Sequence, residues 1–290
     1  MDVSVANYFK RVEKIISRGG PEPSEYDYVV NVPNLEGITL EEESKIHDVL
    51  FPILDKDSLL GHTFYKPHGY AGDFELIDRL YTKWLSPDPS HHKWDNLYHT
   101  LDAATAVRNR KNYFQDVMKN YKNNDELKVL NLGSGPCRDL YEFFVKNPKQ
   151  NIQVDCLDMD QSAIDYGSAV CDNYMDRIEF INKNVFKYKT SKTYDLIWSA
   201  GLFDYFSDKL FIRLVNRMYA LVASNGELVI GNFSTVNTSK NLMETFGQWY
   251  LNHRSEDLLI ELALKAGVPE DKIMIKEEPT GVNFFLHLEK

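Results

Sequence analysis

From residue 127 onward, short apolar runs alternate with longer stretches in which apolar residues recur every three or four positions. The short runs are rich in branched and aromatic residues, as buried strands are, whereas the longer stretches have the helical period. Seven strands are predicted, at residues 129–132, 153–157, 176–182, 194–200, 228–233, 273–277 and 283–288. Helices are predicted from residues 138 and 162, and over residues 209–222, 241–251 and 256–266. This alternation predicts an α/β fold with a doubly wound, mostly parallel seven-stranded sheet.

The last two predicted strands are joined by a turn at Pro279, Thr280 and Gly281. A parallel pair of strands needs a crossover connection of about a dozen or more residues, which this turn does not provide. The final strand is therefore expected to run antiparallel to its neighbour.

The first 124 residues have a different pattern, in which helical periods are interrupted by glycine and proline. Helices are predicted over residues 3–17, 40–54, 73–85 and 95–121. We therefore expect a helical cap or lid over residues 1–124 and a cofactor-binding sheet domain over residues 125–290.

Composition and charge narrow the classes of function. The chain of 290 residues is 43% hydrophobic and 26% charged, as globular proteins are, and it has no apolar run of membrane-spanning length. A net charge of −10 disfavours binding to a nucleic-acid backbone. Three cysteines without regular spacing indicate a reduced, cytoplasmic protein, and His91, His92 and His99 lack partners at a metal-binding spacing. We expect no nucleic-acid, membrane or metal partner, and the oligomeric state stays open.

The most informative segment is the glycine-rich turn Gly133-Ser134-Gly135 after the first predicted strand. Glycines let the backbone approach a ligand closely, and a helix that begins at Arg138 presents free N–H groups to it. The turn therefore predicts a nucleotide-like ligand. A dinucleotide fingerprint requires a glycine at position 138, where the chain has Arg138, so a nicotinamide cofactor is disfavoured.

Between Asn131 and Cys137, the turn resembles the acid-x-G-x-G-x-G motif of class I S-adenosylmethionine-dependent methyltransferases. Gly133 and Gly135 match the motif, Asn131 stands where that family has an acid, and Cys137 stands at the third glycine. The resemblance implies a Rossmann-like methyltransferase fold with S-adenosylmethionine as its cofactor. Asn131 cannot offer the charge that an acid offers to the cofactor's ammonium group. Another group must compensate, or the amino-acid end of the cofactor is held differently.

Further cofactor contacts are expected where the next predicted strands end. Asp158 ends the second strand, where a carboxylate can accept from both ribose hydroxyls; the alternative is that it caps the following helix. Asn184 follows the third strand and can read the adenine edge, or it is an ordinary loop residue. The predicted cofactor-binding residues are Asn131, Gly133, Ser134, Gly135, Asp158, Met159, Asn184, Val185, Ser199 and Gly201.

Four other segments resemble a narrower group, the bacterial methyltransferases related to the enzymes that make 3-hydroxypalmitic acid methyl ester. They are K-P-H-G-Y-A-G-D at 66–73, G-L-F-D-Y at 201–205, G-N-F at 231–233 and W-Y-L-N-H-R-S at 249–255. This resemblance implies methylation of a small acid. We expect O-methylation of a hydroxy or fatty carboxylic acid.

The choice of acceptor decides which catalytic groups are needed. A carboxylate is ionised at pH 7 and needs no general base, whereas a hydroxyl group does. The candidate bases are His99, His253 and Asp204, each with a surface or capping role as its alternative.

Arginine indicates an acidic substrate because its planar fork binds carboxylates. Arg254 and Arg108 are candidates to clamp a carboxylate of the substrate or of the cofactor, although Arg108 shares a stretch with Arg110 and Lys111 that is typical of a solvated helix face. The loop at residues 69–73 is expected to cap the cofactor; its alternative is a turn whose aspartate caps the next helix. The predicted substrate-binding residues are Tyr70, Asp73, Arg108, Tyr205 and Arg254.

Two other functions stay open. The neutral Asn131 keeps a cyclase or lyase in consideration, in which the cofactor's own uncharged amine displaces methylthioadenosine and forms azetidine-2-carboxylate. The third possibility is a cofactor-binding regulatory protein without enzymatic activity.

Overall fold

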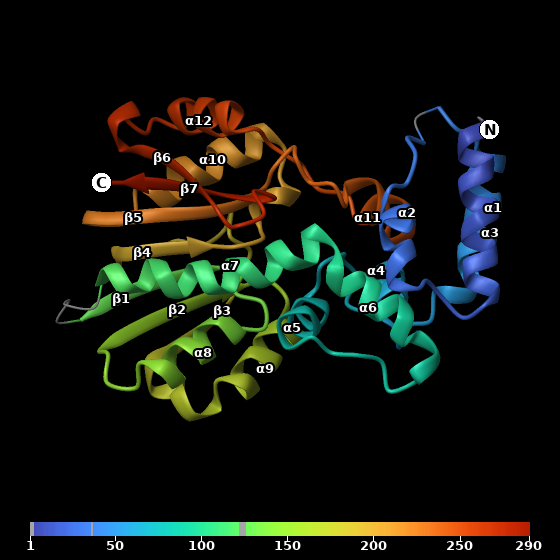
Figure 1. Ribbon diagram of the computed structural model, residues 1–290. Coiled ribbons are helices and arrows are strands. Elements are labelled where there is room, and N and C mark those ends of the chain that lie inside the picture. The colour runs from blue at the N-terminus through green and yellow to red at the C-terminus, as the bar shows by residue number, and fades with distance from the viewer. Residues whose placement is uncertain (1–2, 36, 122–125) are drawn as a thin grey trace. The chain divides into compact units, whose positions relative to one another are not determined.

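The computed structural model describes residues 3–35, 37–121 and 126–290 (Figure 1). The chain divides into two compact units. The helical unit comprises residues 1–105 and 238–250, and the sheet unit comprises residues 106–237 and 251–290. The boundary predicted at residues 124 and 125 lies outside the described residues, and the predicted lid role of residues 1–124 stays a prediction.

The sheet unit contains the seven predicted strands in a single sheet. They are β1 (Leu127–Leu132), β2 (Ile152–Asp158), β3 (Ile178–Asn182), β4 (Tyr194–Ser199), β5 (Val222–Phe233), β6 (Ile273–Glu277) and β7 (Asn283–Glu289). Their order is β3-β2-β1-β4-β5-β7-β6, and β7 is antiparallel to both neighbours while the other pairs are parallel. The mostly parallel seven-stranded sheet and the antiparallel final strand are confirmed.

The strand order places a switch point between β1 and β4. From these two neighbours the chain builds outward in opposite directions, through β2 and β3 on one side and through β5 on the other. Ligands of open α/β sheets bind beyond the carboxyl ends of the strands at such a point. The carboxyl edge of β1 and β4 is therefore where a site is expected.

Helices cover both faces of this sheet (Figure 1). The helices are α7 (Asp102–Met118), α8 (Arg138–Lys146), α9 (Gln161–Val170), α10 (Asp208–Tyr219) and α12 (Glu256–Lys265). Phe114 of α7 packs with Trp198 in the core of one face, and Phe211 of α10 packs with Ile197 in the core of the other. Consecutive residues of β4 thus enter opposite cores, as alternation along a strand requires.

The helical unit agrees with the predicted pattern in part. Its helices are α1 (Val3–Ser17), α2 (Tyr26–Val30), α3 (Leu40–Leu50), α4 (Leu59–Tyr65), α5 (Phe74–Thr82), α6 (His92–Thr100) and α11 (Lys240–Gly247). The single helix predicted over 95–121 is wrong, because Leu101 has an extended ψ of 138° that separates α6 from α7. The helix predicted over 40–54 ends at Leu50 and continues as a 3-10 turn at Phe51–Ile53. Helices α2 and α4 have five and seven residues, too few for a helical period to be visible in the sequence.

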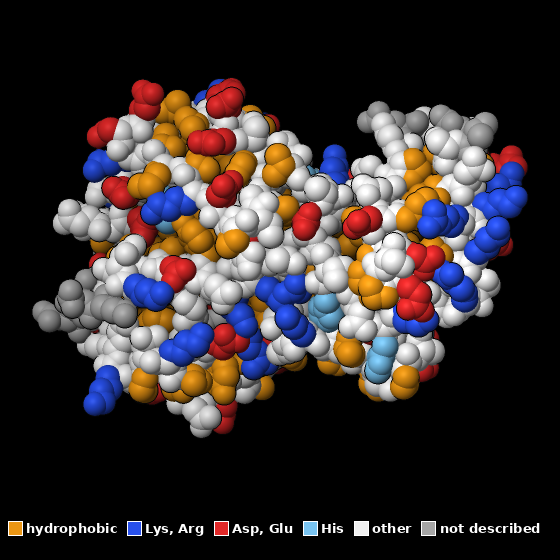
Figure 2. Space-filling view, viewed as in Figure 1, with side chains coloured by type: hydrophobic (Ala, Val, Ile, Leu, Met, Phe, Trp, Pro, Cys, Tyr) orange, Lys and Arg blue, Asp and Glu red, His pale blue; other side chains and the backbone are white. Residues whose placement is uncertain are grey.

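Acidic and basic side chains are interspersed over the face shown in Figure 2. Within residues 3–35, 37–121 and 126–290, no helix has the length and apolar character needed to cross a membrane. Cys137, Cys156 and Cys171 are buried free thiols.

Candidate active site

The glycine turn lies at the carboxyl end of β1. Gly133 and Gly135 have φ values of 63° and 51°, in the left-handed region that favours glycine. A Cβ on Gly133 would lie 3.2 Å from the Cβ of Leu202, which follows β4. The turn therefore packs against the loop after β4, and it leads into α8, whose first N–H groups have no partner within the helix.

Cys137 occupies the third glycine position and keeps the left-handed conformation. Its φ and ψ are 52° and 22°. This conformation costs a non-glycine residue roughly 1–2 kcal/mol. The buried thiol has room because Gly167 of α9 lacks a Cβ, which would lie 3.3 Å from the Cys137 Sγ. A cysteine thus has a left-handed backbone at the position where the motif has its third glycine.

Ser134 lies in the middle of the turn and has an unsatisfied hydroxyl. The residue is 6% exposed, and its Oγ has no hydrogen-bond partner among the described residues. Buried polar groups in native proteins are nearly always bonded. The hydroxyl therefore indicates a ligand that completes the turn.

Asp158 ends β2 beside the turn. Its Oδ2 accepts from the Gly135 N–H at 3.1 Å, and its Oδ1 accepts from the Asp160 N–H at 3.0 Å. Burial raises the pKa of Asp158, and these backbone N–H groups oppose the rise. The N-cap of α9 is Asp160, whose carboxylate accepts from the Ser162 N–H. The capping role considered for Asp158 thus belongs to Asp160, and the Asp158 carboxylate faces the glycine turn.

Three predicted cofactor-binding residues, Met159, Asn184 and Val185, follow β2 and β3. The Asn184 Nδ2 is 4.0 Å from the Met159 Sδ, and the Asn184 Oδ1 accepts from the Phe186 N–H at 2.9 Å. Met159 is largely exposed and Val185 is buried. Their contact with the cofactor stays a prediction, as does the adenine contact of Asn184.

Ser199 and Gly201 lie at the end of β4. The Ser199 Oγ donates to the Leu132 carbonyl oxygen at 3.1 Å, so this hydroxyl ties β4 to β1. A Cβ on Gly201 would lie 2.7 Å from the Nη1 of Arg110. Gly201 therefore makes room for an arginine that sequence analysis assigned to a solvated helix face.

Arg110 of α7 is the candidate residue that sequence analysis missed. It is 7% exposed, and its Nη1 donates to the Ala200 carbonyl oxygen at 3.4 Å. Burial raises the pKa values of Asp139 and Asp204, and the charge of Arg110 opposes the rise in both. A buried cation therefore stands at the carboxyl edge of β4.

Asp204 is a buried carboxylate held at the ends of β4 and β5. It is 1% exposed, and its Oδ1 accepts from the Phe233 N–H at 2.7 Å. Burial raises the pKa of Asp204 to about 6, against this hydrogen bond and the charges of Arg110 and Arg254. Burial is therefore the largest influence on the pKa of this carboxyl group.

Arg254 is 1% exposed, and each of its guanidinium nitrogens donates to an acceptor in the sheet unit. Nε and Nη2 donate to the Asp208 carboxylate, Nη2 also donates to the Phe206 carbonyl oxygen, and Nη1 donates to the Asn232 Oδ1 and the Phe203 carbonyl oxygen. These bonds tie the loop after β4 to the end of β5. The predicted contact of Arg254 with substrate stays a prediction that this geometry does not favour.

The two predicted histidine bases are engaged by protein atoms. The His253 Nε2 accepts from the Asn237 amide at 3.0 Å, and its Nδ1 donates to the Leu251 carbonyl oxygen at 3.1 Å. His99 belongs to the helical unit, where its Nε2 donates to the Trp84 carbonyl oxygen at 2.7 Å. The three predicted bases therefore do not share one compact unit, since Asp204 and His253 belong to the sheet unit.

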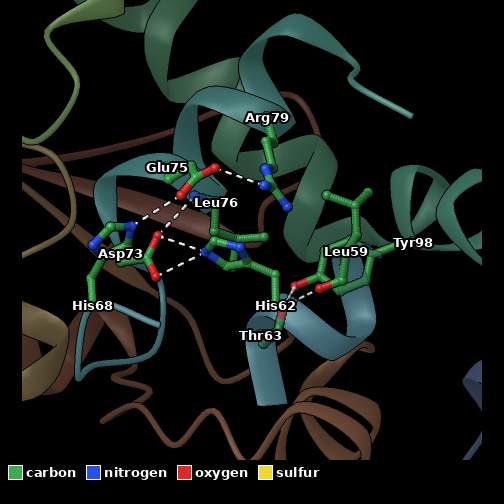
Figure 3. A network of polar contacts seen from close by, with 9 residues as sticks. All are labelled: Leu59, His62, Thr63, His68, Asp73, Glu75, Leu76, Arg79 and Tyr98. Carbon is green, nitrogen blue, oxygen red and sulfur yellow. Dashed lines mark hydrogen bonds and ion pairs between the residues drawn. The ribbon is translucent and has the colours of Figure 1, made fainter. Parts of the chain in front are cut away.

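Asp73 is part of a buried polar network in the helical unit (Figure 3). Its carboxylate accepts from the Leu76 N–H at 2.9 Å, and both of its oxygens lie 3.0 Å from the His62 Nε2. The Thr63 and Tyr98 hydroxyls bond each other at 2.9 Å in the same network. Asp73 thus has the helix-capping role that was its alternative, and its contact with substrate stays a prediction.

The other predicted substrate residues are divided between the units. Tyr205 is exposed in the sheet unit, where Arg108 is half-buried and burial lowers its pKa. Tyr70 is half-buried in the helical unit. Their contacts with substrate stay predictions.

The groups at the carboxyl edge fit S-adenosylmethionine. Asp158 offers a carboxylate for a ribose diol, and the left-handed glycines let the backbone approach closely. The unsatisfied Ser134 hydroxyl offers a hydrogen bond to a polar end of the ligand.

Residues 129–226 match a family described as a methyltransferase domain. No curated protein sequence matches the chain. A possible exported protein from Bordetella parapertussis aligns over 99% of this chain and 95% of its own, with 16% identity and a TM-score of 0.68.

Two further solved structures share the fold. The S-adenosylmethionine-dependent methyltransferase SibL, in its apo form, aligns over 92% of this chain and 74% of its own, with 11% identity and a TM-score of 0.54. The magnesium protoporphyrin IX methyltransferase of Synechocystis PCC 6803, with bound S-adenosylhomocysteine, aligns over 65% of this chain and 87% of its own, with 9% identity and a TM-score of 0.51. Residues 129–226 therefore carry a methyltransferase domain, in a sheet unit that shares the fold of these solved structures.

Proposed function

We propose that the protein transfers a methyl group from S-adenosylmethionine to a carboxylate oxygen of a small acid. The observation that carries this proposal is the state of the three predicted bases. His253 uses both ring nitrogens within the protein, His99 donates its Nε2–H to a carbonyl group, and Asp204 is buried with one oxygen bonded to a backbone N–H. A hydroxyl acceptor needs a base, whereas a carboxylate is ionised at pH 7 and needs none.

S-adenosylmethionine supplies an activated methyl group when it is bound. The protein's own part is to align donor and acceptor and to exclude water, and alignment of this kind can be worth about 7–11 kcal/mol of barrier. In this proposal Asp158 holds the ribose and the turn around Ser134 holds the amino-acid end. Arg254 keeps the loop after β4 rigid beside the acceptor.

The four segments at 66–73, 201–205, 231–233 and 249–255 support a hydroxy or fatty acid as the acceptor, through their resemblance to the 3-hydroxypalmitic acid methyl ester group. We also propose a lid role for residues 1–124 and no need for a nucleic-acid or membrane partner. The buried free thiols support a reducing compartment, the cytoplasm, as the place where the protein works.

The test is a set of acceptors of equal chain length: a fatty acid, its 3-hydroxy derivative, the fatty alcohol and the fatty amine. Each is incubated with the protein and S-adenosylmethionine, and S-adenosylhomocysteine and the methylated product are measured by mass spectrometry. We expect turnover with the acids alone, at a rate that stays flat between about pH 7 and 9 because the carboxylate is ionised throughout. Turnover with the alcohol or amine and none with either acid would contradict the proposal.

A second candidate reaction is the cyclisation of S-adenosylmethionine itself. It is favoured by Asn131, a buried neutral amide at the end of β1 where the family has an acid. An amine that lacks a nearby negative charge loses its proton more readily, which the cyclisation requires. Methylthioadenosine formed without any acceptor, and faster than in a protein-free control, would support this reaction. Cofactor binding with neither product would support the regulatory protein.

A further inference from the structure

Three groups at or near the carboxyl ends of β1 and β4 can donate hydrogen bonds. The Ser134 hydroxyl is buried without a partner among the described residues, and the Arg110 guanidinium carries donors alone. Asn131 adds an amide where the family has a carboxylate. An ammonium group needs acceptors, whereas a carboxylate needs donors. The Ser134 hydroxyl and the Asn131 amide can each donate or accept, so the fixed positive charge of Arg110 is what favours a carboxylate over an ammonium group.

The position of the Arg110 guanidinium is built into the sheet unit. Its Nη1 donates to the Ala200 carbonyl oxygen at 3.4 Å, the long end of the hydrogen-bond range. Gly201 leaves the space that the guanidinium occupies, since a Cβ there would lie 2.7 Å from Nη1. The arginine therefore reaches the end of β4, next to the strand that carries Asn131 and the glycine turn.

Two carboxylates near Arg110 are already bonded to backbone donors. The Asp139 Oδ1 accepts from the Leu140 N–H at 2.8 Å, and the Asp204 Oδ1 accepts from the Phe233 N–H at 2.7 Å. Both feel the charge of Arg110, which lowers their pKa values against the effect of burial. These two carboxylates stabilise the charge of the buried Arg110, because burying an arginine without nearby anions costs free energy.

We propose that Arg110, together with Ser134, binds the carboxylate of the cofactor's methionine end. This contact replaces the acid–ammonium contact that Asn131 cannot make. The cofactor is then recognised through its carboxylate, and its amine has no charged partner at position 131. The inference rests on the cofactor alone, so it holds for either an acid acceptor or cyclisation.

The test measures equilibrium binding of three ligands to the full chain by calorimetry: S-adenosylhomocysteine, its decarboxylated analogue and its deaminated analogue. Hydrogen bonds to a charged group predict that loss of the carboxylate weakens binding about 10- to 100-fold. Loss of the amine should weaken it less than about fivefold, as for a neutral contact. The Arg110→Gln variant should bind S-adenosylhomocysteine as weakly as the wild type binds the decarboxylated analogue, and it should bind that analogue unchanged. The control is Arg213→Gln, an exposed arginine on α10, which should bind all three ligands like the wild type.

Equal losses for both analogues in the wild type would overturn the proposal, and this comparison does not depend on any variant folding. A variant Arg110→Gln that weakens all three ligands alike would also overturn it, because a structural role does not distinguish the ligands. If the wild type bound none of the three, the cofactor assignment itself would fail, which separates that outcome from a failure of the arginine contact. Thermal melting of each variant checks that the binding data describe folded protein.

Discussion

Replacing Gly201 by alanine is expected to weaken cofactor binding while leaving the fold intact. The new Cβ would lie 2.7 Å from the Arg110 Nη1, closer than side chains tolerate. The obstructing atom is the far end of a flexible side chain, so the guanidinium withdraws and the backbone stays in place. The backbone of Gly201 is not left-handed, so alanine adds no strain of its own.

The size of the effect follows from the contact that is lost. A hydrogen bond to a charged group is worth about 1.5–3 kcal/mol, which corresponds to a loss of affinity of about 10- to 100-fold for S-adenosylhomocysteine. The free energy of unfolding should fall by about 0.5–1.5 kcal/mol, because the displaced Arg110 loses its hydrogen bond to the Ala200 carbonyl oxygen. Calorimetric titration gives the affinity, and urea denaturation gives the stability.

The matched control is Gly231→Ala on β5. A Cβ there would lie 2.7 Å from the Ala200 carbonyl oxygen, a backbone atom that cannot withdraw. This variant should lose about 1–3 kcal/mol of stability from overpacking. Wild-type affinity in Gly201→Ala, or a loss of stability as large as that of Gly231→Ala, would refute the reasoning about Arg110.

Three other substitutions test the packing and titration of the sheet unit. Gly167→Ala should cost about 1–3 kcal/mol in urea denaturation because its Cβ would lie 3.2 Å from the Gly135 carbonyl oxygen and 3.3 Å from both the Cys137 Sγ and the Phe180 Cε1. The added change Cys137→Gly removes only the thiol contact and should restore part of this loss, whereas a double variant no more stable than Gly167→Ala would contradict it. Burial raises the pKa of Glu227, but its hydrogen bond with His287 opposes the rise, and the pKa lies below its usual value overall. The pair therefore stabilises the fold fully above the pKa of the unfolded carboxyl group, and this stabilisation is lost as the pH falls. Glu227→Gln should therefore cost about 1.5–3 kcal/mol at pH 7 and less below about pH 4, and an equal cost at both pH values would argue against an ionised pair. Burial raises the pKa of Asp204 to about 6, so the folded chain holds the proton more tightly than the unfolded chain and the free energy of unfolding falls as the pH rises toward 6. The free energy of unfolding of Asp204→Asn, relative to that of the wild type, should therefore rise by about 1.4 kcal/mol between pH 5 and 8. A difference between variant and wild type that does not change with pH would exclude this shift.

The sheet could be predicted from sequence because its signals are local. Each buried strand is a short apolar run, and the turn at residues 279–281 is too tight for a crossover, so the antiparallel β7 follows from chain length alone. The helices of the helical unit were harder to predict from sequence. The break at Leu101 has no glycine or proline to mark it, and α4 is a single short helix capped by Ser58.

The candidate site divides in the same way. The glycine turn and Asp158 follow strand ends, which a sequence pattern marks. Arg110 and Arg108 lie in the same stretch of sequence, and no local pattern distinguishes them. The difference comes from tertiary packing, because Gly201 leaves space in which Arg110 is buried at the end of β4. Arg254 was predicted to bind a carboxylate of the substrate or the cofactor. The structure shows that its N–H groups donate to the protein itself, including the loop after β4.

The nucleoside products of S-adenosylmethionine test methyl transfer to an acid most directly. The purified protein is incubated with the cofactor, first alone and then with a panel of hydroxy acids, and the products are separated by mass spectrometry. We expect S-adenosylhomocysteine to appear only when an acid is present. Methylthioadenosine formed without an acceptor, faster than in a protein-free control, would contradict methyl transfer and establish the cyclase in its place.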